Sequence, residues 1–232
     1  MSLYVLLDLV IVAGPLALSF DRKVRYVRRW PAALLSSLIV GVPYAIWDSA
    51  MTAKGAWGFT ERFAGAFRIL FLPPGELLFF IVVPFSCAFI YEVITAYVPE
   101  RSPGSARIPW ISAAVLLAVG AILFRARLYT SSVALSAALF LVLAAILSPN
   151  TLGSRVFWLS VAASYAPFLV ANGALTSIPV VTYAKWAILG PRVFSIPIED
   201  FLYSFSLLGF TFLTYRSLRT PLEIPGLRRG AR

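Results

Sequence analysis

The sequence predicts an all-α transmembrane protein: a seven-helix bundle built from two parallel three-helix repeats and one linker helix. Three observations lead to this class, namely the composition, the number of long apolar runs, and a motif that occurs twice. Hydrophobic residues make up 60% of the 232 residues, charged residues make up only 13%, and the mean hydropathy is +0.85. Soluble domains carry roughly 25% charged residues, so this chain lacks the polar groups needed to cover a surface in water.

Seven apolar runs are long enough to cross a hydrocarbon core of about 30 Å, which takes about 17–25 helical residues. Several runs contain proline or glycine, which a helix bundle tolerates as kinks. The runs are continuously apolar rather than alternating, so membrane-spanning strands are not expected. The predicted helices cover residues 2–20, 31–51, 76–98, 108–124, 131–148, 155–172 and 197–217.

The repeated motif consists of two elements at nearly constant spacing. Pro43–Thr52 reads PYAIWDSAMT and Pro167–Thr176 reads PFLVANGALT, so proline, an acid or amide, and threonine recur at an offset of 124. A Pro-x-Glu follows each copy, as Pro74-Gly75-Glu76 and Pro197-Ile198-Glu199, at an offset of 123. Membrane proteins with such repeats place their substrate sites at the repeat interface. We therefore expect the acids of both copies to share one site.

The topology follows from the helix number and the positive charges. Three helices per copy is an odd number, so a linker helix is needed for the copies to run parallel. We expect a first repeat over 1–100, a linker with one transmembrane helix over 101–130, and a second repeat with a basic cytoplasmic tail over 131–232. Arginine and lysine number 13 on the side of the tail and 7 on the other. The positive-inside rule therefore predicts a multi-pass plasma-membrane protein with its N-terminus outside and its C-terminus in the cytoplasm. The thirteen are Arg22, Lys23, Arg25, Arg28, Arg29, Arg101, Arg107, Arg155, Arg216, Arg219, Arg228, Arg229 and Arg232.

Several classes of site are not expected. The chain has no histidine and a single cysteine, Cys87, so neither a metal site nor an intrachain disulfide is predicted. It has no glycine-rich dinucleotide or P-loop motif. The net charge is +10, but the cations lie in short loops between apolar runs, which indicates topology and contact with membrane lipid rather than nucleic-acid binding. The N-terminus lacks the pattern of a cleaved signal peptide, so the first run should be retained.

Four of the ten acids lie at helix ends or just inside apolar runs: Asp48, Glu76, Glu199 and Asp200. A charge at mid-bilayer costs about 2.5–3.5 kcal/mol on insertion scales, so intramembrane acids are usually functional. The alternative is that Glu76 and Glu199 are only favourable first-turn carboxylates. Two further acids have other expected roles. Asp8 is either buried or at the interface, and Glu92 is expected to pair with an arginine of the first loop.

Aromatic residues surround these acids, namely Trp47, Trp57, Phe79, Phe80 and Tyr203. Tryptophan and tyrosine also form belts at membrane interfaces, so this enrichment has a structural alternative. The functional alternative is a cation–π lining, which stabilises a desolvated cation by about 2 kcal/mol or more. Acids and aromatic faces in an apolar cavity are suited to protonating an alkene and guiding the carbocation that results.

At these residues the chain resembles the membrane-integral, two-part type of lycopene cyclase, which occurs as paired subunits in some bacteria and as a fused chain in archaea and fungi. The combination of W-D, G-x-W-x-F and P-x-E-L-x-F-F is the most specific part of the resemblance. The matching segments are Pro15–Trp30, Pro43–Phe59, Leu72–Glu92 and Ser195–Phe205.

The resemblance implies a fused cyclase with two similar halves and without the flavin of the soluble-type cyclases, so no cofactor is expected. It implies a non-redox isomerase of carotenoid biosynthesis that closes the acyclic ends of lycopene, or of a related carotenoid, to β-type rings. The residues themselves leave the ring type open. The first copy departs from the family pattern, because Leu77 occupies the second acid position that Asp200 keeps in the second copy.

On this interpretation, Glu76 or Glu199 donates the proton and Asp48 or Asp200 is its partner or the base. Glu199→Gln is then expected to abolish cyclisation without preventing insertion. Asn172, which replaces Asp48 in the second copy, is expected to line the polyene path with the five aromatic residues. Association with a second copy or with other carotenoid-pathway enzymes stays open.

Two other functions fit the same helix count. A 3+1+3 repeat is also the plan of small-molecule transporters, although the Pro-Gln pair of the sugar carriers is missing. A retinal protein would need a lysine deep in a helix, and Lys23, Lys54 and Lys185 all fall in loops or at helix edges.

Overall fold

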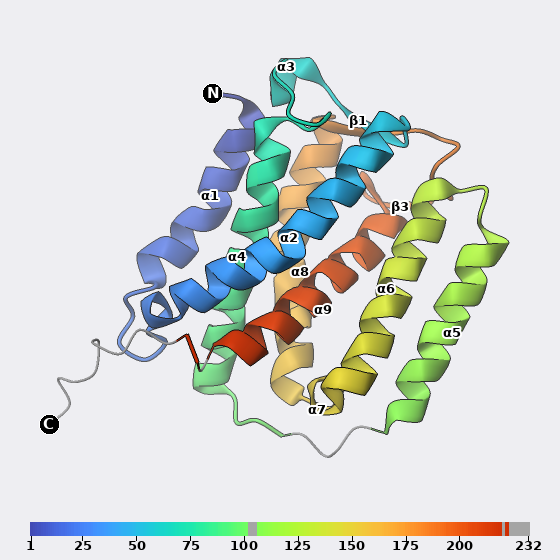
Figure 1. Ribbon diagram of the computed structural model, residues 1–232. Helices are drawn as coiled ribbons and strands as arrows, with labels where there is room; N and C mark the ends of the chain where they lie inside the picture. Colours follow the sequence, from blue (N-terminus) through green and yellow to red (C-terminus); the bar gives the residue numbers. More distant parts are fainter. Residues whose placement is uncertain (102–105, 220, 223–232) are drawn as a thin grey trace, which may run out of the picture.

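The computed structural model describes residues 1–101, 106–219 and 221–222, and within them the chain is predominantly helical (Figure 1). The all-α class is therefore confirmed. Each predicted apolar run coincides with a long helix. These helices are α1 (Leu3–Leu18), α2 (Trp30–Ala53), α4 (Pro74–Tyr97), α5 (Arg107–Leu123), α6 (Leu128–Leu147), α8 (Arg155–Ser177) and α9 (Ile198–Leu218).

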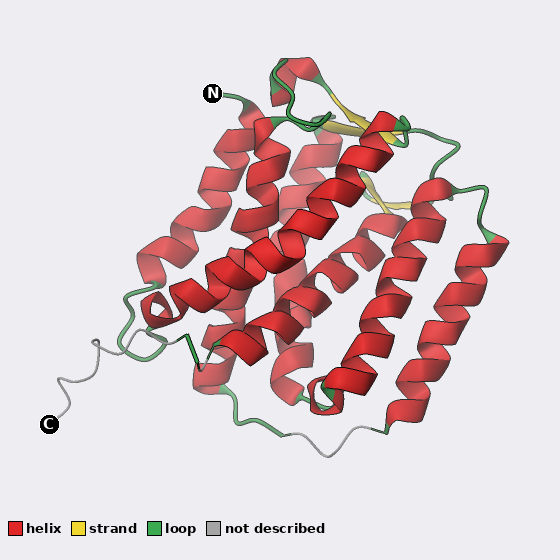
Figure 2. Ribbon diagram, viewed as in Figure 1, coloured by secondary structure: helices red, strands yellow, loops and turns green. Residues whose placement is uncertain are grey.

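Short elements occupy the connections between the long helices (Figure 2). The helical ones are a 3₁₀ turn, η1 (Tyr26–Arg29), and two single turns, α3 (Glu61–Ala64) and α7 (Pro149–Leu152). The strands are β1 (Trp57–Phe59), β2 (Val181–Tyr183), β3 (Arg192–Val193) and β4 (Ile196–Pro197). Strand β1 pairs with β2 in antiparallel register, with Trp57 opposite Tyr183. This pair joins the loop after α2 to the loop after α8.

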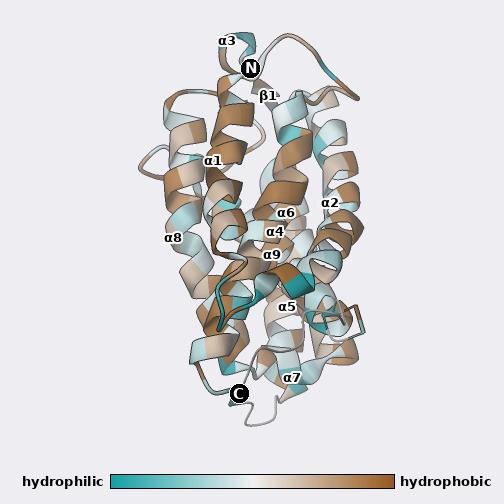
Figure 3. Cartoon of the chain, turned by 90° about the vertical axis from the view of Figure 1, so that its left-hand side faces the viewer, coloured by the Kyte–Doolittle hydropathy of each residue, from teal (hydrophilic) through white to brown (hydrophobic). Residues whose placement is uncertain are grey.

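Four helical segments of the described chain are long and apolar enough to cross a membrane: η1 with α2 (Tyr26–Ala53), α4, α6 and α8. Helices α1 and α5 are apolar but shorter. Hydrophobic residues run along the outside of α1, whereas hydrophilic residues gather near the ends of the bundle, for example at α3 and α7 (Figure 3). The protein is therefore a helical membrane protein.

The helix starts follow from capping and from proline. Ser2 precedes α1 and its hydroxyl accepts a hydrogen bond from the Val5 amide at 3.3 Å, while Ser154 caps α8 in the same way for Phe157 at 3.0 Å. Helix α4 starts with Pro74, whose missing N–H would have no helical partner at that position. The internal prolines Pro15, Pro43, Pro84 and Pro167 lie within continuous helices, as expected for tolerated kinks.

Helix α4 lies at the centre of the bundle and contacts α1, α2, α8 and α9, whereas α5 lies at one edge against α6 (Figure 1). Gly41 allows α2 and α4 to approach closely, because a Cβ at this position would lie 2.5 Å from the Phe80 carbonyl oxygen. A buried aromatic cluster fills the end of the bundle opposite to β1 and β2. It includes Phe85, Tyr91, Phe140, Phe157, Phe212 and Tyr215.

Several predicted boundaries need correction. Helix α8 continues five residues beyond the predicted end at 172, so Pro167–Thr176 lies wholly within a helix, as Pro43–Thr52 does. The predicted linker boundary at 130 falls inside α6, which starts at Leu128. Arg216, assigned to the tail, belongs to α9. Arg228, Arg229 and Arg232 lie outside the described residues.

Candidate active site

The predicted acids come from three helix ends at the same end of the bundle. Asp48 lies near the C-terminal end of α2, Glu76 in the first turn of α4, and Glu199 and Asp200 in the first turn of α9. All four are buried, with exposed fractions of 2% to 7%. The Pro-x-Glu motifs produce this arrangement, because each starts a helix and places its glutamate in the first turn.

Asp48 and Glu76 form a close pair of carboxyl groups that lie within hydrogen-bonding range of each other. Tyr4 OH donates to Glu76 Oε2 at 2.5 Å, and Trp57 Nε1 donates to Asp48 Oδ1 at 2.5 Å. In the described part of the chain, no lysine or arginine forms an ion pair with either group. Two adjacent buried carboxylates without a cation repel each other strongly, so the pair is most stable when it shares a proton.

Asp200 has a different environment, because three neutral donors surround its carboxylate. Tyr129 OH donates to Oδ1 at 2.7 Å, while Tyr183 OH and Asn172 Nδ2 donate to Oδ2 at 2.8 and 2.7 Å. Hydrogen bonds to the charged form of a carboxyl group favour that form. Burial raises the pKa of the Tyr183 phenol well above its ordinary value, and Asp200 raises it further, so this hydroxyl keeps its proton and acts as a donor. The three hydrogen bonds therefore favour the carboxylate form of Asp200, whereas its burial favours the neutral form.

Glu199 has hydrogen-bond partners of its own. Its Oε1 accepts hydrogen bonds from Thr130 Oγ1 and from the Leu189 amide, both at 2.7 Å. Asp48, Glu76 and Asp200 line a cavity in the bundle, and Glu199 is not part of its wall. The structure thus brings Asp48, Glu76 and Asp200 to one cavity and leaves Glu199 beside it.

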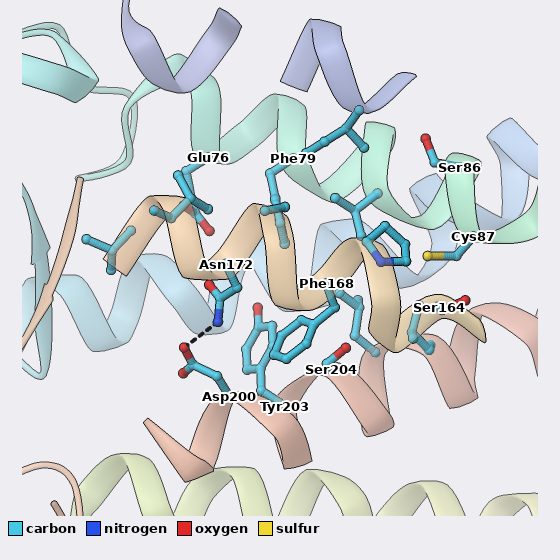
Figure 4. A pocket seen from close by; sticks show the side chains of 18 of the residues that line it. Glu76, Phe79, Ser86, Cys87, Ser164, Phe168, Asn172, Asp200, Tyr203 and Ser204 are labelled. Atoms are coloured by element: carbon cyan, nitrogen blue, oxygen red, sulfur yellow. Dashed lines mark hydrogen bonds between the residues drawn. The ribbon is translucent and has the colours of Figure 1, made fainter. Parts of the chain in front are cut away.

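A cavity of about 330 Å³ runs from these three acids into the apolar interior between α1, α4, α8 and α9 (Figure 4). Its polar end holds the carboxyl groups and their phenol and amide partners. Exposed residues Gly14 and Leu18 of α1 and Pro167 of α8 also belong to its wall, so the cavity opens on the bundle surface between these two helices. The apolar part of the wall includes Ile11, Pro15, Val83, Phe89, Ile90, Phe168, Ala171, Leu175, Leu207 and Leu208.

The predicted aromatic residues divide into two groups. Trp57, Phe79 and Tyr203 line the cavity, as does Asn172. Trp47 lies behind Tyr203, against which it stacks with ring centroids 5.1 Å apart. Phe80 is buried where α4 meets α2, next to Gly41. Trp47 and Phe80 therefore support the cavity rather than line it.

Three residues of the site were not predicted from the sequence: Tyr4, Tyr129 and Tyr183. Each donates its hydroxyl to one of the acids, and Tyr129 and Tyr183 also stack at 5.8 Å. Tyr4 and Tyr129 lie near the predicted outer ends of apolar runs, a position that is also typical of interfacial belts. Tyr183 lies in the predicted loop between residues 172 and 197, where the sequence gives no signal for it.

The remaining buried acids lie outside this cluster. Asp8 has no exposed surface, and within the described residues neither of its carboxyl oxygens has a hydrogen-bond partner. Of its two predicted positions, the buried one is correct. Glu92 accepts from Tyr215 OH at 3.0 Å and pairs with Arg219 at 3.1 Å, so its arginine partner here comes from the end of α9, whereas we expected one from the first loop. Among the described residues, no group of three or more potential ligands could hold a metal ion.

Comparison with known proteins gives one result. A family model described as lycopene cyclase matches residues 1–94 and 126–218, which together cover most of the chain and include every acid at the cavity. The unmatched stretch between them contains α5. No match was found among curated proteins or among solved structures.

Proposed function

Because the chain belongs to the lycopene cyclase family, we propose that it closes the acyclic ends of lycopene, or of a related carotenoid, to β-type rings by adding one proton and removing another. Family membership makes it a carotenoid-cyclising membrane enzyme. It lends no support to the alternative of a small-molecule transporter.

One observation carries the proposal. Three buried carboxyl groups from separate helices face one end of an apolar cavity, and the pair Asp48–Glu76 differs in hydrogen bonding from Asp200. A cyclase of this kind needs an acid that holds a proton and a base that does not. Where the surroundings of two carboxyl groups favour different protonation states, one group can act as the acid and the other as the base.

The reaction starts at the Asp48–Glu76 pair. The pair transfers its proton to the terminal double bond of the polyene, which leaves a tertiary cation on the neighbouring carbon. A second double bond of the same acyclic end attacks that cation and closes a six-membered ring. The positive charge then lies on a carbon of this ring. A carboxylate then removes a ring proton, and the electron pair of that C–H bond becomes the ring double bond. One proton enters and one leaves, so the product is an isomer and no electrons are exchanged.

The cavity wall fits a substrate that is apolar before protonation and carries a positive charge afterwards. Trp57, Phe79 and Tyr203 present aromatic rings beside the carboxyl groups. An aromatic face stabilises a desolvated cation by about 2 kcal/mol or more, and the apolar part of the wall excludes water that would otherwise capture the cation. Glu199 then has a supporting role, because its bonds to Thr130 and Leu189 hold the first turn of α9 in place.

The architecture is part of the proposal. We infer seven membrane-spanning helices, in which α1, α2 and α4 form one repeat, α6, α8 and α9 form the other, and α5 is the linker. Asp48 and Asn172 then occupy corresponding positions, and so do Glu76 and Glu199. The excess of arginine and lysine at the end opposite to the acids supports an N-terminus outside the plasma membrane and a cytoplasmic C-terminus.

Expression in a lycopene-accumulating bacterium, followed by pigment chromatography, tests the function. The wild type is expected to produce cyclic carotenoid, whereas Asp48→Asn, Glu76→Gln and Asp200→Asn are expected to leave lycopene unchanged. Glu199→Gln should retain part of the activity. Glu61→Gln is a matched control at an exposed acid and should behave as the wild type. Lycopene that stays acyclic with well-expressed wild type would refute the proposal.

A deuterium experiment tests the non-redox mechanism separately. Membranes containing the enzyme are incubated with lycopene in heavy water. The mechanism predicts one deuterium atom per ring formed, at the carbon that accepts the proton, and no requirement for an added oxidant or reductant. Rings without deuterium would contradict proton addition as the first step.

A further inference from the structure

The three hydrogen bonds to Asp200 are distributed unevenly over its two oxygens. Oδ2 accepts from Tyr183 OH and Asn172 Nδ2, whereas Oδ1 accepts from Tyr129 OH. A carboxylate offers about four lone-pair positions, two on each oxygen. Within the described part of the chain, Oδ2 is therefore fully occupied and one position stays free on Oδ1, in a residue that lines the cavity (Figure 4).

The donors also fix where this free position lies. Tyr129 belongs to α6, Asn172 to α8 and Tyr183 to β2, so three separate elements hold one carboxylate. The rings of Tyr129 and Tyr183 stack almost in parallel, 5.8 Å apart at 14°, and Trp57 packs edge-on against Tyr129 at 4.8 Å. Rotation of the Asp200 side chain would break all three hydrogen bonds. Its orientation is therefore fixed before any substrate enters.

Position matters more than base strength for the last step of the proposed reaction. The ring cation can lose a proton from any of three neighbouring carbons, and each choice puts the product double bond in a different place. A carbocation is a far stronger acid than a carboxylic acid, so any carboxylate within reach can take the proton. The proton that is lost is then the one closest to the base, because reactions between positioned groups depend steeply on geometry.

We propose that Oδ1 of Asp200 is the base that determines the ring type, and that Tyr129, Asn172 and Tyr183 are positioning residues that aim it. The inference rests on the proposed cyclase function and adds to it the origin of product specificity. In the step itself the C–H bond breaks, its electron pair forms the ring double bond, and the proton bonds to Oδ1. The Asp48–Glu76 pair has lost one proton by then, so between turnovers the pair takes up a proton from the solvent and Asp200 releases its proton to the solvent.

The test is the ratio of ring isomers, measured by chromatography and NMR of the pigments, in the lycopene-accumulating host. The wild type should give one predominant ring type. Tyr129→Phe and Tyr183→Phe each remove one hydrogen bond to a charged group, so the ratio of the main ring isomer to the others should fall roughly tenfold or more. A structural role alone would lower the amount of product without changing this ratio.

Tyr215→Phe is the matched control, because it removes a buried tyrosine hydroxyl that donates to a carboxylate, Glu92, at the opposite end of the bundle. It should leave the ratio unchanged. Asp200→Glu provides an independent arm, since it keeps the charge but moves the carboxylate by one methylene, and it should also alter the ratio. Unchanged ratios in Tyr129→Phe, Tyr183→Phe and Asp200→Glu would overturn the inference while leaving cyclisation intact. The absence of any rings from the wild type would instead refute the function.

Discussion

Gly75 controls the approach of Tyr4 to Glu76. A Cβ at this position would lie 2.6 Å from Cγ of Tyr4, which is much closer than packed carbon atoms approach. We predict that Gly75→Ala displaces the phenol ring, weakens its hydrogen bond to Glu76, and lowers the cyclisation rate at least about tenfold, since small misplacements of positioned groups can cost factors of 100. Product formation per amount of enzyme in isolated membranes measures the effect.

Gly120→Ala in α5 is the matched control for this variant. No other group lies within 4 Å of a Cβ at Gly120, and alanine is more stable than glycine inside a helix by roughly 0.5–1 kcal/mol. This variant should be as active as the wild type. Equal activity of Gly75→Ala and Gly120→Ala would show that the contact of Tyr4 with Gly75 is unimportant.

Asp8 is an unusual residue for a helix interface. Its side chain is fully buried and, within the described residues, its carboxyl oxygens have no hydrogen-bond partner. An unsatisfied buried polar group costs about 1–3 kcal/mol. We predict that Asp8→Leu, which keeps the branched Cγ and removes both polar oxygens, raises the midpoint of thermal unfolding of the detergent-solubilised protein.

Asp21→Leu is the matched control, because the same substitution here removes an acid that has hydrogen-bond partners. Asp21 lies in the loop after α1, and its Oδ1 accepts hydrogen bonds from the amides of Lys23 and Val24, both at 2.9 Å. Its removal should lower the unfolding midpoint, since such bonds contribute about 0.5–1.5 kcal/mol each. A lower midpoint for Asp8→Leu as well would mean that Asp8 has a stabilising partner.

At the scale of elements, the strand pair β1–β2 supplies a donor to each part of the site. Trp57 of β1 donates to Asp48, and Tyr183 of β2, its direct partner in the register, donates to Asp200. We predict that Trp57→Phe lowers cyclisation about tenfold, because Asp48 loses a hydrogen bond of about 1.5 kcal/mol or more to a charged or proton-sharing group. Pigment chromatography provides the measurement.

Trp158→Phe controls for the loss of an indole N–H in general. Trp158 donates to the Leu152 carbonyl at 2.8 Å, near the other end of α8. This variant should keep its activity. If it lost as much activity as Trp57→Phe, the effect would come from packing and not from Asp48.

The helices could be predicted and the strands could not, for a physical reason. A membrane helix satisfies its own backbone and needs only a long apolar run, so the start of α4 at Pro74 and of α8 at Arg155 is visible in the local sequence. Strand β1 has three residues and forms only because β2, more than a hundred residues away, lies beside it. The acids were found because charge is rare in apolar runs, whereas Tyr129 and Tyr183 were missed because their partners become apparent only in three dimensions.

At the scale of the whole molecule, the site is shared between the two ends of the chain. Asp48 and Glu76 precede the stretch that includes α5, Asp200 follows it, and α4 packs against both α8 and α9. We predict that residues 1–101 and 106–232, produced as separate chains in one cell, assemble and cyclise lycopene. Each part produced alone should be inactive.

Co-purification of the two parts from membranes would confirm their assembly. A matched control is a break inside α4, after Val83, which should prevent both assembly and activity because it cuts the central helix. Activity of the first part alone would show that Asp200 is dispensable.

The opening of the cavity between α1 and α8 has a consequence for how such an enzyme meets its reactant. A hydrocarbon that enters sideways from the acyl chains never dissolves in the water on either side of the membrane. The turnover rate therefore depends on the mole fraction of pigment in the bilayer. Enzyme and substrate meet by lateral diffusion in the plane of the membrane. Adding buffer to a suspension of vesicles would leave the rate per enzyme unchanged, whereas fusing them with empty lipid would slow it.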